Sequence, residues 1–359
     1  MYERVQAVLK EREVEAMIVS AESNIRYLSG YRGDTGYLYI SGKQRVLMTD
    51  SRYTTQAAAE APEFKIMEIG AERNYGQLIH DLLKEDNATS LGFEDTSLIY
   101  ADMIKLKEKC GDIRWEPLGE HLNKLRIVKT PEELKRLEKA EHIGDKAFDY
   151  ILGEIKPGIT ELQLAAKLEY RMKELGAEDK SFNTIVASGL NSAMPHAIPS
   201  NRKIEKGDFV TMDFGCRHEG YCSDMTRTVV VGKADDKQKE IYNTVLQAQL
   251  AALEVLKAGM KGSEVDKVAR DIITEAGYGA YFGHGLGHSV GLDIHEEPRL
   301  SPTCHEVLLE NVIATVEPGI YVPDFGGVRI EDMVVVTKKG YQNFTHSPKE
   351  LIELAEFYN

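Results

Sequence analysis

The 359-residue chain lacks the basic surplus that binding to nucleic acids or to anionic membranes calls for. It has 44 lysines and arginines against 58 aspartates and glutamates, which gives a formal net charge of −14. Polyanions select a positively charged surface, because contacts to their phosphates supply much of the affinity. We therefore expect neither nucleic acid nor a membrane among the partners of this protein.

Long apolar runs are missing as well. No stretch of about 18 apolar residues, the length of a membrane-spanning helix, occurs in the sequence. Charged residues interrupt the first twelve positions, so these positions do not form the apolar core of a signal peptide. The two absences predict a cytoplasmic protein.

Cysteine is scarce, and its spacing is uninformative. The chain has four cysteines, none in a C-x-x-C pair: Cys110, Cys216, Cys222 and Cys304. In a reducing cytoplasm we expect four free thiols. The alternative is a disulfide between Cys216 and Cys222.

Length and local pattern predict two domains. Helix-like and strand-like segments alternate over residues 1–125, which is typical of an α/β domain of ordinary size. The expected helices are residues 2–12 and 76–84, and the expected strands are residues 16–20, 37–40, 45–49 and 90–93. A boundary follows near residue 125, because Thr130, Pro131 and Glu133 are the N-cap, first position and capping-box partner of a helix reaching Leu152.

Residues 126–359 contain a weak internal sequence repeat. The segment Lys156-Pro-Gly-Ile-Thr-Glu161 opens one helix, and Lys257-Ala-Gly-Met-Lys-Gly-Ser-Glu264 opens a similar helix about a hundred residues later. A stretch rich in strands and turns follows each helix. We expect an α+β domain of two pseudosymmetric halves with a site between them. Alternatively, two unrelated helices share common capping residues.

Two aspartates lie in neighbouring β-prone segments. A tight hairpin centred on His218 and Glu219 would place Asp213 directly opposite Asp224, about 4.5–5.5 Å apart at Cβ. An inward carboxylate in an apolar strand is costly unless it is paired or binds a cation. The pattern predicts a cation between the two acids. The alternative is a pair of solvated acids at a strand edge, which the apolar neighbours disfavour: Val210, Met212 and Phe214.

The same pattern recurs near the C-terminus. Two strand-like segments, Thr315–Val322 and Gly327–Val336, each hold one glutamate among apolar residues, Glu317 and Glu331. The two-residue period of a strand places Arg329 on the face of Glu331. Arg329 is then either an ordinary salt-bridge partner or, in addition, the residue that fixes the glutamate.

Three of the ten histidines fall within twelve residues: His284, His288 and His295. Glycines at 283, 285, 287 and 291 oppose a helix here, and the glutamate of an H-E-x-x-H zinc motif is absent. Four carboxylates and one imidazole suit Mn²⁺ or Co²⁺ better than a thiolate zinc site. Bridging carboxylates suit two ions about 3.5–4 Å apart.

Together these motifs resemble the Xaa-Pro peptidases, aminopeptidase P and prolidase, within the pita-bread metallopeptidases. The resemblance covers nearly the whole chain and includes Asn24–Gly30, which is similar to the start of a creatinase-type N-terminal domain. The matching segments are Met194-Pro-His-Ala-Ile-Pro199, Met212-Asp-Phe-Gly215, Cys222-Ser-Asp-Met-Thr-Arg227, His284–Glu296, Val316-Glu-Pro-Gly-Ile-Tyr321 and Gly327-Val-Arg-Ile-Glu-Asp332. It implies a creatinase-like α/β domain over residues 1–125 and a pita-bread catalytic domain over residues 126–359.

The resemblance also implies roles for individual residues. The five matching metal ligands are Asp213, Asp224, His288, Glu317 and Glu331, with Asp224 and Glu331 bridging two ions and Glu317 also moving the proton. The other matching residues are His196, His284 and His295, which face the substrate, and Arg329, which packs beside the site. The two ions are expected to be Mn²⁺, with Co²⁺ or Zn²⁺ as alternatives, and a homodimer is expected. Singly, His196 and His295 could also be structural histidines.

The resemblance predicts hydrolysis of the bond between an N-terminal residue and proline in peptides, as in aminopeptidase P. The alternative is a prolidase, which cleaves dipeptides only and needs a cation, for which Arg299 is the candidate unless it is a surface arginine. A methionine aminopeptidase is disfavoured by residues 1–125. A non-catalytic pita-bread protein, or one with a structural metal alone, would not need the complete set of ligands and histidines.

Overall fold

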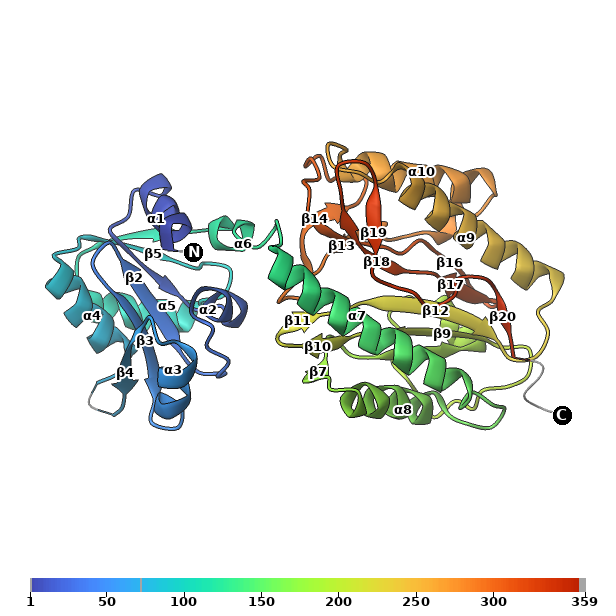
Figure 1. Cartoon of the computed structure of the whole chain (residues 1–359), viewed down its shortest axis with the longest axis horizontal. Coiled ribbons are helices and arrows are strands. Elements are labelled where there is room, and N and C mark those ends of the chain that lie inside the picture. Colours follow the sequence, from blue (N-terminus) through green and yellow to red (C-terminus); the bar gives the residue numbers. More distant parts are fainter. Residues whose placement is uncertain (1, 72, 355–359) are drawn as a thin grey trace. The chain divides into compact units, whose positions relative to one another are not determined.

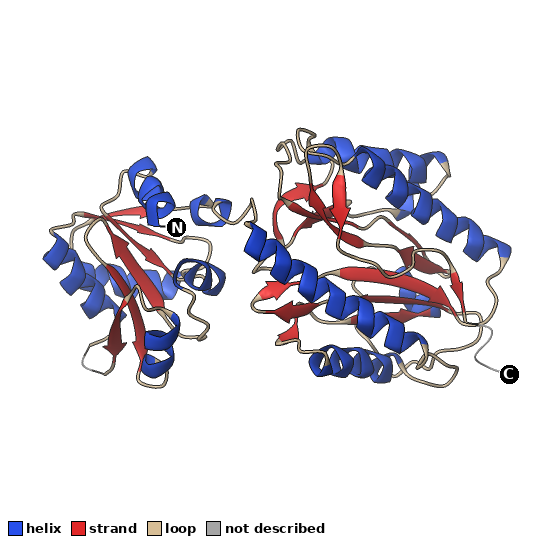
Figure 2. Ribbon diagram, in the orientation of Figure 1, coloured by secondary structure: helices blue, strands red, loops and turns tan. Residues whose placement is uncertain are grey.

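The computed structural model describes residues 2–71 and 73–354, and the chain divides into two units, Met1–Arg126 and Ile127–Asn359. Figures 1 and 2 show both units. None of the described helices combines the length and the apolarity that crossing a membrane requires. All four cysteines are free thiols, as expected, and the alternative disulfide is not formed.

The first unit is a six-stranded mixed sheet with helices on both faces. The strand order is β4-β3-β2-β1-β5-β6, with β2 antiparallel to both of its neighbours and the other pairs parallel. Successive residues of β1 point to opposite faces: Met17 packs with helix α1, whereas Ile18 packs with α4 and α5. The strands are β1 (Ala16–Val19), β2 (Tyr37–Ser41), β3 (Arg45–Asp50), β4 (Lys65–Ile69), β5 (Ser90–Phe93) and β6 (Arg114–Pro117). The helices are α1 (Tyr2–Glu11), α2 (Glu22–Ser29), α3 (Thr54–Glu60), α4 (Tyr75–Asp86), α5 (Tyr100–Cys110) and α6 (His121–Lys124).

The second unit places its strands between two helix pairs, α7 with α8 and α9 with α10 (Figures 1 and 2). The helices are α7 (Pro131–Leu152), α8 (Glu161–Glu174), α9 (Asp236–Val255) and α10 (Gly262–Glu275). The strands are β7 (Asp179–Lys180), β8 (Ile185–Ser188), β9 (Phe209–Phe214), β10 (Cys216–His218), β11 (Tyr221–Cys222), β12 (Met225–Val230), β13 (Gly287–Ser289), β14 (Glu296–Leu300), β15 (Ile313–Val316), β16 (Gly319–Val322), β17 (Gly326–Arg329), β18 (Asp332–Val336), β19 (Tyr341–Asn343) and β20 (Ile352–Glu353). Two 3₁₀ turns complete the unit, η1 (Gly189–Ala193) and η2 (Gly279–Tyr281).

The predicted two-halved organisation is confirmed. Helices α8 and α10 both have 14 residues, and each follows a glycine with φ of +94°, Gly158 or Gly259. The two glycine amides make equivalent bonds, to the carbonyl of Ile204 at 2.8 Å and of Leu308 at 2.9 Å. One apolar core joins α7 and α8 to β8, β9 and β12, and a second joins α9 and α10 to β15, β16 and β18. Each half therefore buries its own helix pair against its own strands.

The capping box predicted at the start of the second unit is also present. The amide of Glu133 donates to Oγ1 of Thr130 at 3.3 Å, and the amide of Thr130 donates to Oε2 of Glu133 at 2.8 Å. These bonds satisfy two amides that the first helical turn leaves unpaired. Helix α7 then runs to Leu152, as predicted.

Candidate active site

A cavity of about 830 Å³ in the second unit gathers the predicted site residues. Its walls include all of them: His196, Asp213, Asp224, His284, His288, His295, Glu317, Arg329 and Glu331. Arg299 lines the same cavity. Residues more than a hundred positions apart in the chain thus face one space.

The five predicted ligands hold two kinds of position in the fold. Asp213 lies inside β9 and His288 inside β13. Asp224 precedes β12, Glu317 lies between β15 and β16, and Glu331 lies between β17 and β18. At these three breaks the chain passes from one sheet to another, so the carboxylates sit where the ladders of hydrogen bonds are interrupted.

The predicted pairing of Asp213 with Asp224 was wrong. The partner of Asp213 across the hairpin, on β12, is Thr226, and the turn lies at Glu219 and Gly220, one position later than predicted. Both turn residues have positive φ, +47° and +87°, which is the geometry that joins two strands tightly and that glycine adopts readily. Asp224 therefore lies diagonally from Asp213, two positions along from Thr226, and still reaches the cavity.

The two C-terminal segments predicted to be continuous strands are each split in two. Glu317 is followed by Pro318, which has no amide hydrogen to extend the β15 ladder. The amide of Glu317 bonds instead to the carbonyl of Leu286 at 2.8 Å, and the amide of Glu331 bonds to the carbonyl of Thr226 at 3.1 Å. Both glutamates are thus held by segments outside their own hairpins.

Three of the five predicted ligands form a tight cluster. Asp224, His288 and Glu331 each offer a ligand atom, and these atoms lie within 4.8 Å of one another. Nε2 of His288 is 3.5 Å from Oδ2 of Asp224 and 3.4 Å from Oε1 of Glu317. One imidazole nitrogen thus faces at least two carboxylates in a buried setting.

The electrostatics of the cluster favour neutralisation of its buried carboxylates. Burial, followed by repulsion from Glu331 and Asp213, raises the pKa of Asp224 well above its usual value. Burial and the charge of Glu317 likewise raise the pKa of Glu331, and burial raises the pKa of Glu317 to about 7. Two buried carboxylate oxygens, Oδ1 of Asp213 and Oε1 of Glu331, have no hydrogen-bond partner in the protein. Divalent ions would neutralise the charges and take up these oxygens, so the residues fit a metal centre.

His288 has the orientation and the protonation state that a metal ligand needs. Its Nδ1 lies 3.0 Å from the carbonyl oxygen of Ser289, which fixes the proton on Nδ1 and leaves the lone pair of Nε2 toward the carboxylates. Burial lowers the pKa of His288 to about 3. The imidazole is therefore neutral near pH 7, the form that binds metals.

A chain of buried polar contacts runs from Asp213 to His284. Arg329 donates from Nη2 to Oδ2 of Asp213 at 2.6 Å and from Nη1 to the hydroxyl of Tyr321 at 2.7 Å. The Tyr321 hydroxyl lies 2.9 Å from Nε2 of His284, whose Nδ1 lies 2.8 Å from the carbonyl of Gly285. Burial lowers the pKa of His284 to about 4, so the tyrosine hydroxyl donates to a neutral ring. Arg329 thus pairs with Asp213 directly, and not with Glu331 as its position in the sequence indicates.

The other two histidines reach the cavity from separate loops. The ring of His295 packs edge-on against His288, with 4.6 Å between the centroids, and burial lowers its pKa. His196 lies in a loop that Glu161 anchors from the start of α8. Both oxygens of Glu161 are used, accepting from the amide of Ser188 at 2.7 Å and the amide of Ser200 at 3.0 Å.

Sequence reasoning missed three hydroxyl groups of the site. Thr226 donates to Glu331 at 2.7 Å, Thr315 donates to Glu317 at 3.0 Å, and Tyr321 joins His284 to Arg329. The sequence holds a signal only for Tyr321, which has Gly319 two positions before it and Gly327 six positions after it. Glycines flank its ring: a Cβ at Gly319 would lie 2.4 Å from the hydroxyl oxygen, and a Cβ at Gly327 would lie 2.8 Å from the ring.

Two family descriptions match the chain. The model of the creatinase/prolidase N-terminal domain matches residues 1–128, and the model of metallopeptidase family M24 matches residues 135–338. An Xaa-Pro dipeptidase of Pyrococcus furiosus is 41% identical over 358 residues, which cover 98% of this chain and 100% of that protein.

Solved structures share the fold over their whole length. The Xaa-Pro dipeptidase from Bacillus anthracis superposes with a TM-score of 0.95 and 44% identity, covering 98% of both chains. The X-Pro aminopeptidase from Thermotoga maritima superposes with a TM-score of 0.89 and 36% identity, covering 97% of this chain and 99% of that one. Together with the carboxylates and histidines around one cavity, these matches show that the chain is a peptidase of metallopeptidase family M24 with the pita-bread fold and a creatinase/prolidase N-terminal domain.

Proposed function

We propose that the protein is an Xaa-Pro dipeptidase, which hydrolyses the peptide bond before proline in dipeptides and depends on two divalent ions. The sequence alone predicts an activity like that of aminopeptidase P, with the dipeptidase as the alternative. The relatives favour the alternative, because the similar proteins from Pyrococcus furiosus and Bacillus anthracis are both called Xaa-Pro dipeptidases. We propose residues 1–125 as the N-terminal domain and residues 126–359 as the catalytic domain.

The metal ligands in this proposal are Asp213, Asp224, His288, Glu317 and Glu331. Four carboxylates and one imidazole favour Mn²⁺, with Co²⁺ or Zn²⁺ as alternatives. Two such ions, when bound, supply an activated water and polarise the scissile carbonyl. The protein supplies the buried, neutral Nε2 of His288 and the unpartnered oxygens of Asp213 and Glu331.

Glu317 is the proposed proton carrier. Its Oε1 accepts from the hydroxyl of Thr315 at 3.0 Å, which fixes the carboxylate beside His288 in the cavity wall. A carboxylate whose pKa burial raises can take a proton from water near neutral pH and return it to the leaving nitrogen. His196 and His295 line the same cavity and would hold the substrate carbonyl. His284 lines the cavity too, and its Nε2 is hydrogen-bonded to the hydroxyl of Tyr321. We therefore assign two roles to His284: it faces the substrate, and it holds the Tyr321 side chain in place.

Arg299 is the residue that we expect to make the enzyme select dipeptides over longer peptides. On the β13–β14 hairpin it is the cross-strand partner of His288, and it lines the cavity. Its Nε forms a salt bridge to Oε1 of Glu297 at 3.5 Å, and because 41% of the Arg299 side chain is exposed this pairing is expected to be weak. A dipeptide ends in a carboxylate directly after the proline ring, so a cation beside the metal ligands would select it.

Substitution of Arg299 tests this proposal. The variant Arg299→Met should raise KM for an Xaa-Pro dipeptide at least tenfold, while turnover of an Xaa-Pro-Xaa tripeptide changes much less. Arg73→Met, which removes an exposed arginine of the first unit, serves as the control. Equal effects of Arg299→Met on the two substrates would contradict the role of Arg299.

Aminopeptidase P activity is the second candidate, because the Thermotoga maritima X-Pro aminopeptidase shares the fold at 36% identity. A wild-type preference for the tripeptide would favour it. A non-catalytic role is disfavoured by the complete set of ligands around the cavity. The homodimer and the cytoplasmic location remain predictions.

A further inference from the structure

Two consecutive residues of β12 contact two consecutive residues at the start of β18. Thr226 and Arg227 belong to one strand, and Glu331 and Asp332 follow each other where β17 gives way to β18. All four are nearly or fully buried. Because neighbouring residues of a strand point to opposite faces, Thr226 meets Glu331 on the cavity side and Arg227 meets Asp332 on the other side.

Thr226 holds the carboxylate of Glu331. Its hydroxyl donates to Oε2 of Glu331 at 2.7 Å and accepts from Nε of Arg329 at 3.1 Å. The carbonyl of Thr226 also accepts from the amide of Glu331 at 3.1 Å. One oxygen of Glu331 is therefore fixed by the protein, and the other, Oε1, has no protein partner.

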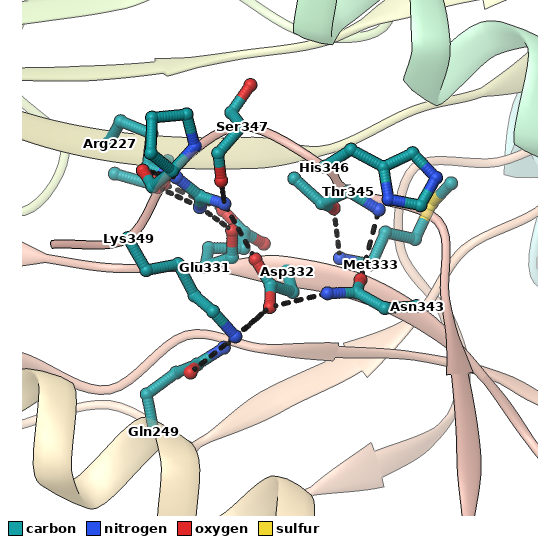
Figure 3. A network of polar contacts seen from close by, with 12 residues as sticks. Arg227, Gln249, Glu331, Asp332, Met333, Asn343, Thr345, His346, Ser347 and Lys349 are labelled. Carbon is teal, nitrogen blue, oxygen red and sulfur yellow. Dashed lines mark hydrogen bonds and ion pairs between the residues drawn. The ribbon is translucent and has the colours of Figure 1, made fainter.

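Arg227 holds the backbone at the same point. Its guanidinium donates to the carbonyl of Glu331 and, at 2.8 Å, to Oδ1 of Asp332, as Figure 3 shows. It also donates to the carbonyls of Ser347 at 2.8 Å and Pro348 at 3.0 Å. A single buried side chain thus ties the Glu331 backbone to the C-terminal segment.

Asp332 anchors this arrangement from behind. Its Oδ2 accepts from Lys349 at 2.7 Å, from Gln249 at 3.0 Å and from Asn343 at 3.0 Å (Figure 3). With Arg227 on Oδ1, both oxygens of Asp332 are satisfied and its charge is matched by two cations. The two adjacent acids therefore differ in their hydrogen bonding. Both carboxylate oxygens of Asp332 have protein partners, whereas Oε1 of Glu331 has none and is the open oxygen of that carboxylate.

We propose that Thr226 and Arg227 are positioning residues of the metal centre, which fix Glu331 so that its open oxygen faces the ions. The inference rests on the metal centre proposed above. On this proposal, side chains that do not contact the metal help to set its affinity. Asp332 contributes indirectly, because it holds Arg227, which in turn holds the backbone of Glu331. Partners of metal ligands typically contribute about 10–100-fold to metal affinity or activity.

Thr226→Val is the primary test, because valine keeps the branched shape and removes only the hydroxyl. Binding of Co²⁺ to the metal-free full chain is measured by calorimetry and by visible absorption. We expect Thr226→Val to weaken at least one Co²⁺ site by about 10–100-fold and to alter the absorption bands. Thr226→Ser, which restores the hydroxyl, should return both readouts toward wild type. A variant that merely loosens the fold would not be rescued in this way.

Lys349→Met tests the anchor without touching a fully buried residue, since 19% of the Lys349 side chain is exposed. It should weaken Co²⁺ binding less than Thr226→Val does. Lys338→Met, which removes a lysine from the exposed pair with Glu310, is the matched control and should leave binding unchanged.

The outcomes separate the two proposals. If wild-type protein binds no Co²⁺, the metal centre and the positioning role both fall. If wild type binds two ions and Thr226→Val binds them with the same affinity and absorption, only the positioning role is overturned.

Discussion

Nη2 of Arg329 lies 2.6 Å from Oδ2 of Asp213, and both side chains are almost completely enclosed. This pair is the one direct ion pair between a predicted ligand and an arginine among the described residues. It leaves Oδ1 of Asp213 without a protein partner. The arginine therefore orients the carboxylate without using all of it, and offsets one of the four negative charges around the cavity.

Arg329→Met should destabilise the protein and disorder the ligand set. Breaking a buried pair by removing one partner costs about 3–5 kcal/mol, because the other charge stays buried. We expect this loss in urea unfolding of the metal-free protein. The double variant Arg329→Met/Asp213→Asn should recover part of the free energy of unfolding. If the double variant is as unstable as the sum of the two single variants, the two residues are not coupled.

Tyr321→Phe should impair catalysis more than folding. The change removes one hydroxyl that joins Arg329 to His284 and leaves buried donors and acceptors unpaired, at a cost of about 1–3 kcal/mol. We expect kcat/KM to fall at least tenfold, with Co²⁺ affinity close to wild type because Tyr321 contacts none of the proposed ligands by hydrogen bond. Unchanged kcat/KM would show that His284 needs no partner.

The metal-free protein should become less stable as pH rises toward 8. The folded-state pKa of Glu317, about 7, lies above the ordinary value of about 4.3. A carboxyl that binds its proton more tightly in the folded state adds stability at acid pH, and that contribution disappears as pH rises through the folded pKa. In chelator, Tm should fall between about pH 6.5 and about pH 8, where the buried histidines are neutral in both the folded and the unfolded state, and Glu317→Gln should flatten the trend.

Saturating Mn²⁺ should reverse this dependence, because metal ligands bind in their deprotonated forms. Differential scanning fluorimetry at both pH values, with and without Mn²⁺, measures all four conditions. A metal-free Tm that rises toward pH 8 would contradict the burial of uncompensated carboxylates.

Lys129 and Glu296 form another buried pair, which supports the hairpin that carries His288 and His295. Nζ of Lys129 lies 3.0 Å from Oε2 of Glu296 and 3.2 Å from Oγ of Ser289. Lys129→Met should lower the free energy of unfolding by about 3–5 kcal/mol. Lys135→Met, in the exposed pair with Glu132, should leave stability close to wild type. Similar effects of the two substitutions would show that Lys129 has no special role.

The sequence predicted what depends on local chemistry. The capping box at Thr130 and Glu133 was correct because both partners lie within one helical turn. The four strands expected in the first unit and the two-halved second unit were also correct, whereas the two edge strands, β4 (Lys65–Ile69) and β6 (Arg114–Pro117), were not predicted. Apolar strands that hold single acids pointed to the residues that line the cavity, because a buried carboxylate needs a partner.

What could not be predicted depends on contacts between distant segments. The hairpin turn at Glu219 and Gly220 is shifted by one position, and a one-position shift changes the partner of Asp213 from Asp224 to Thr226. The break at Glu331 follows from its amide, which bonds to Thr226 far away in the chain. The break at Glu317 has a local cause in Pro318, but the bond from the Glu317 amide to distant Leu286 could not be predicted. The hydroxyl of Thr226 gains its role only from those breaks.

Turnover of a matched set of peptides tests whether the protein is a two-metal Xaa-Pro dipeptidase. Full-length protein loaded with Mn²⁺ is given an Xaa-Pro dipeptide, an Xaa-Pro-Xaa tripeptide and an Xaa-Ala dipeptide, with its metal content measured in parallel. We expect two ions per chain and the highest kcat/KM for the Xaa-Pro dipeptide. Protein that contains two ions and cleaves neither proline peptide, or that prefers the tripeptide, would contradict this expectation.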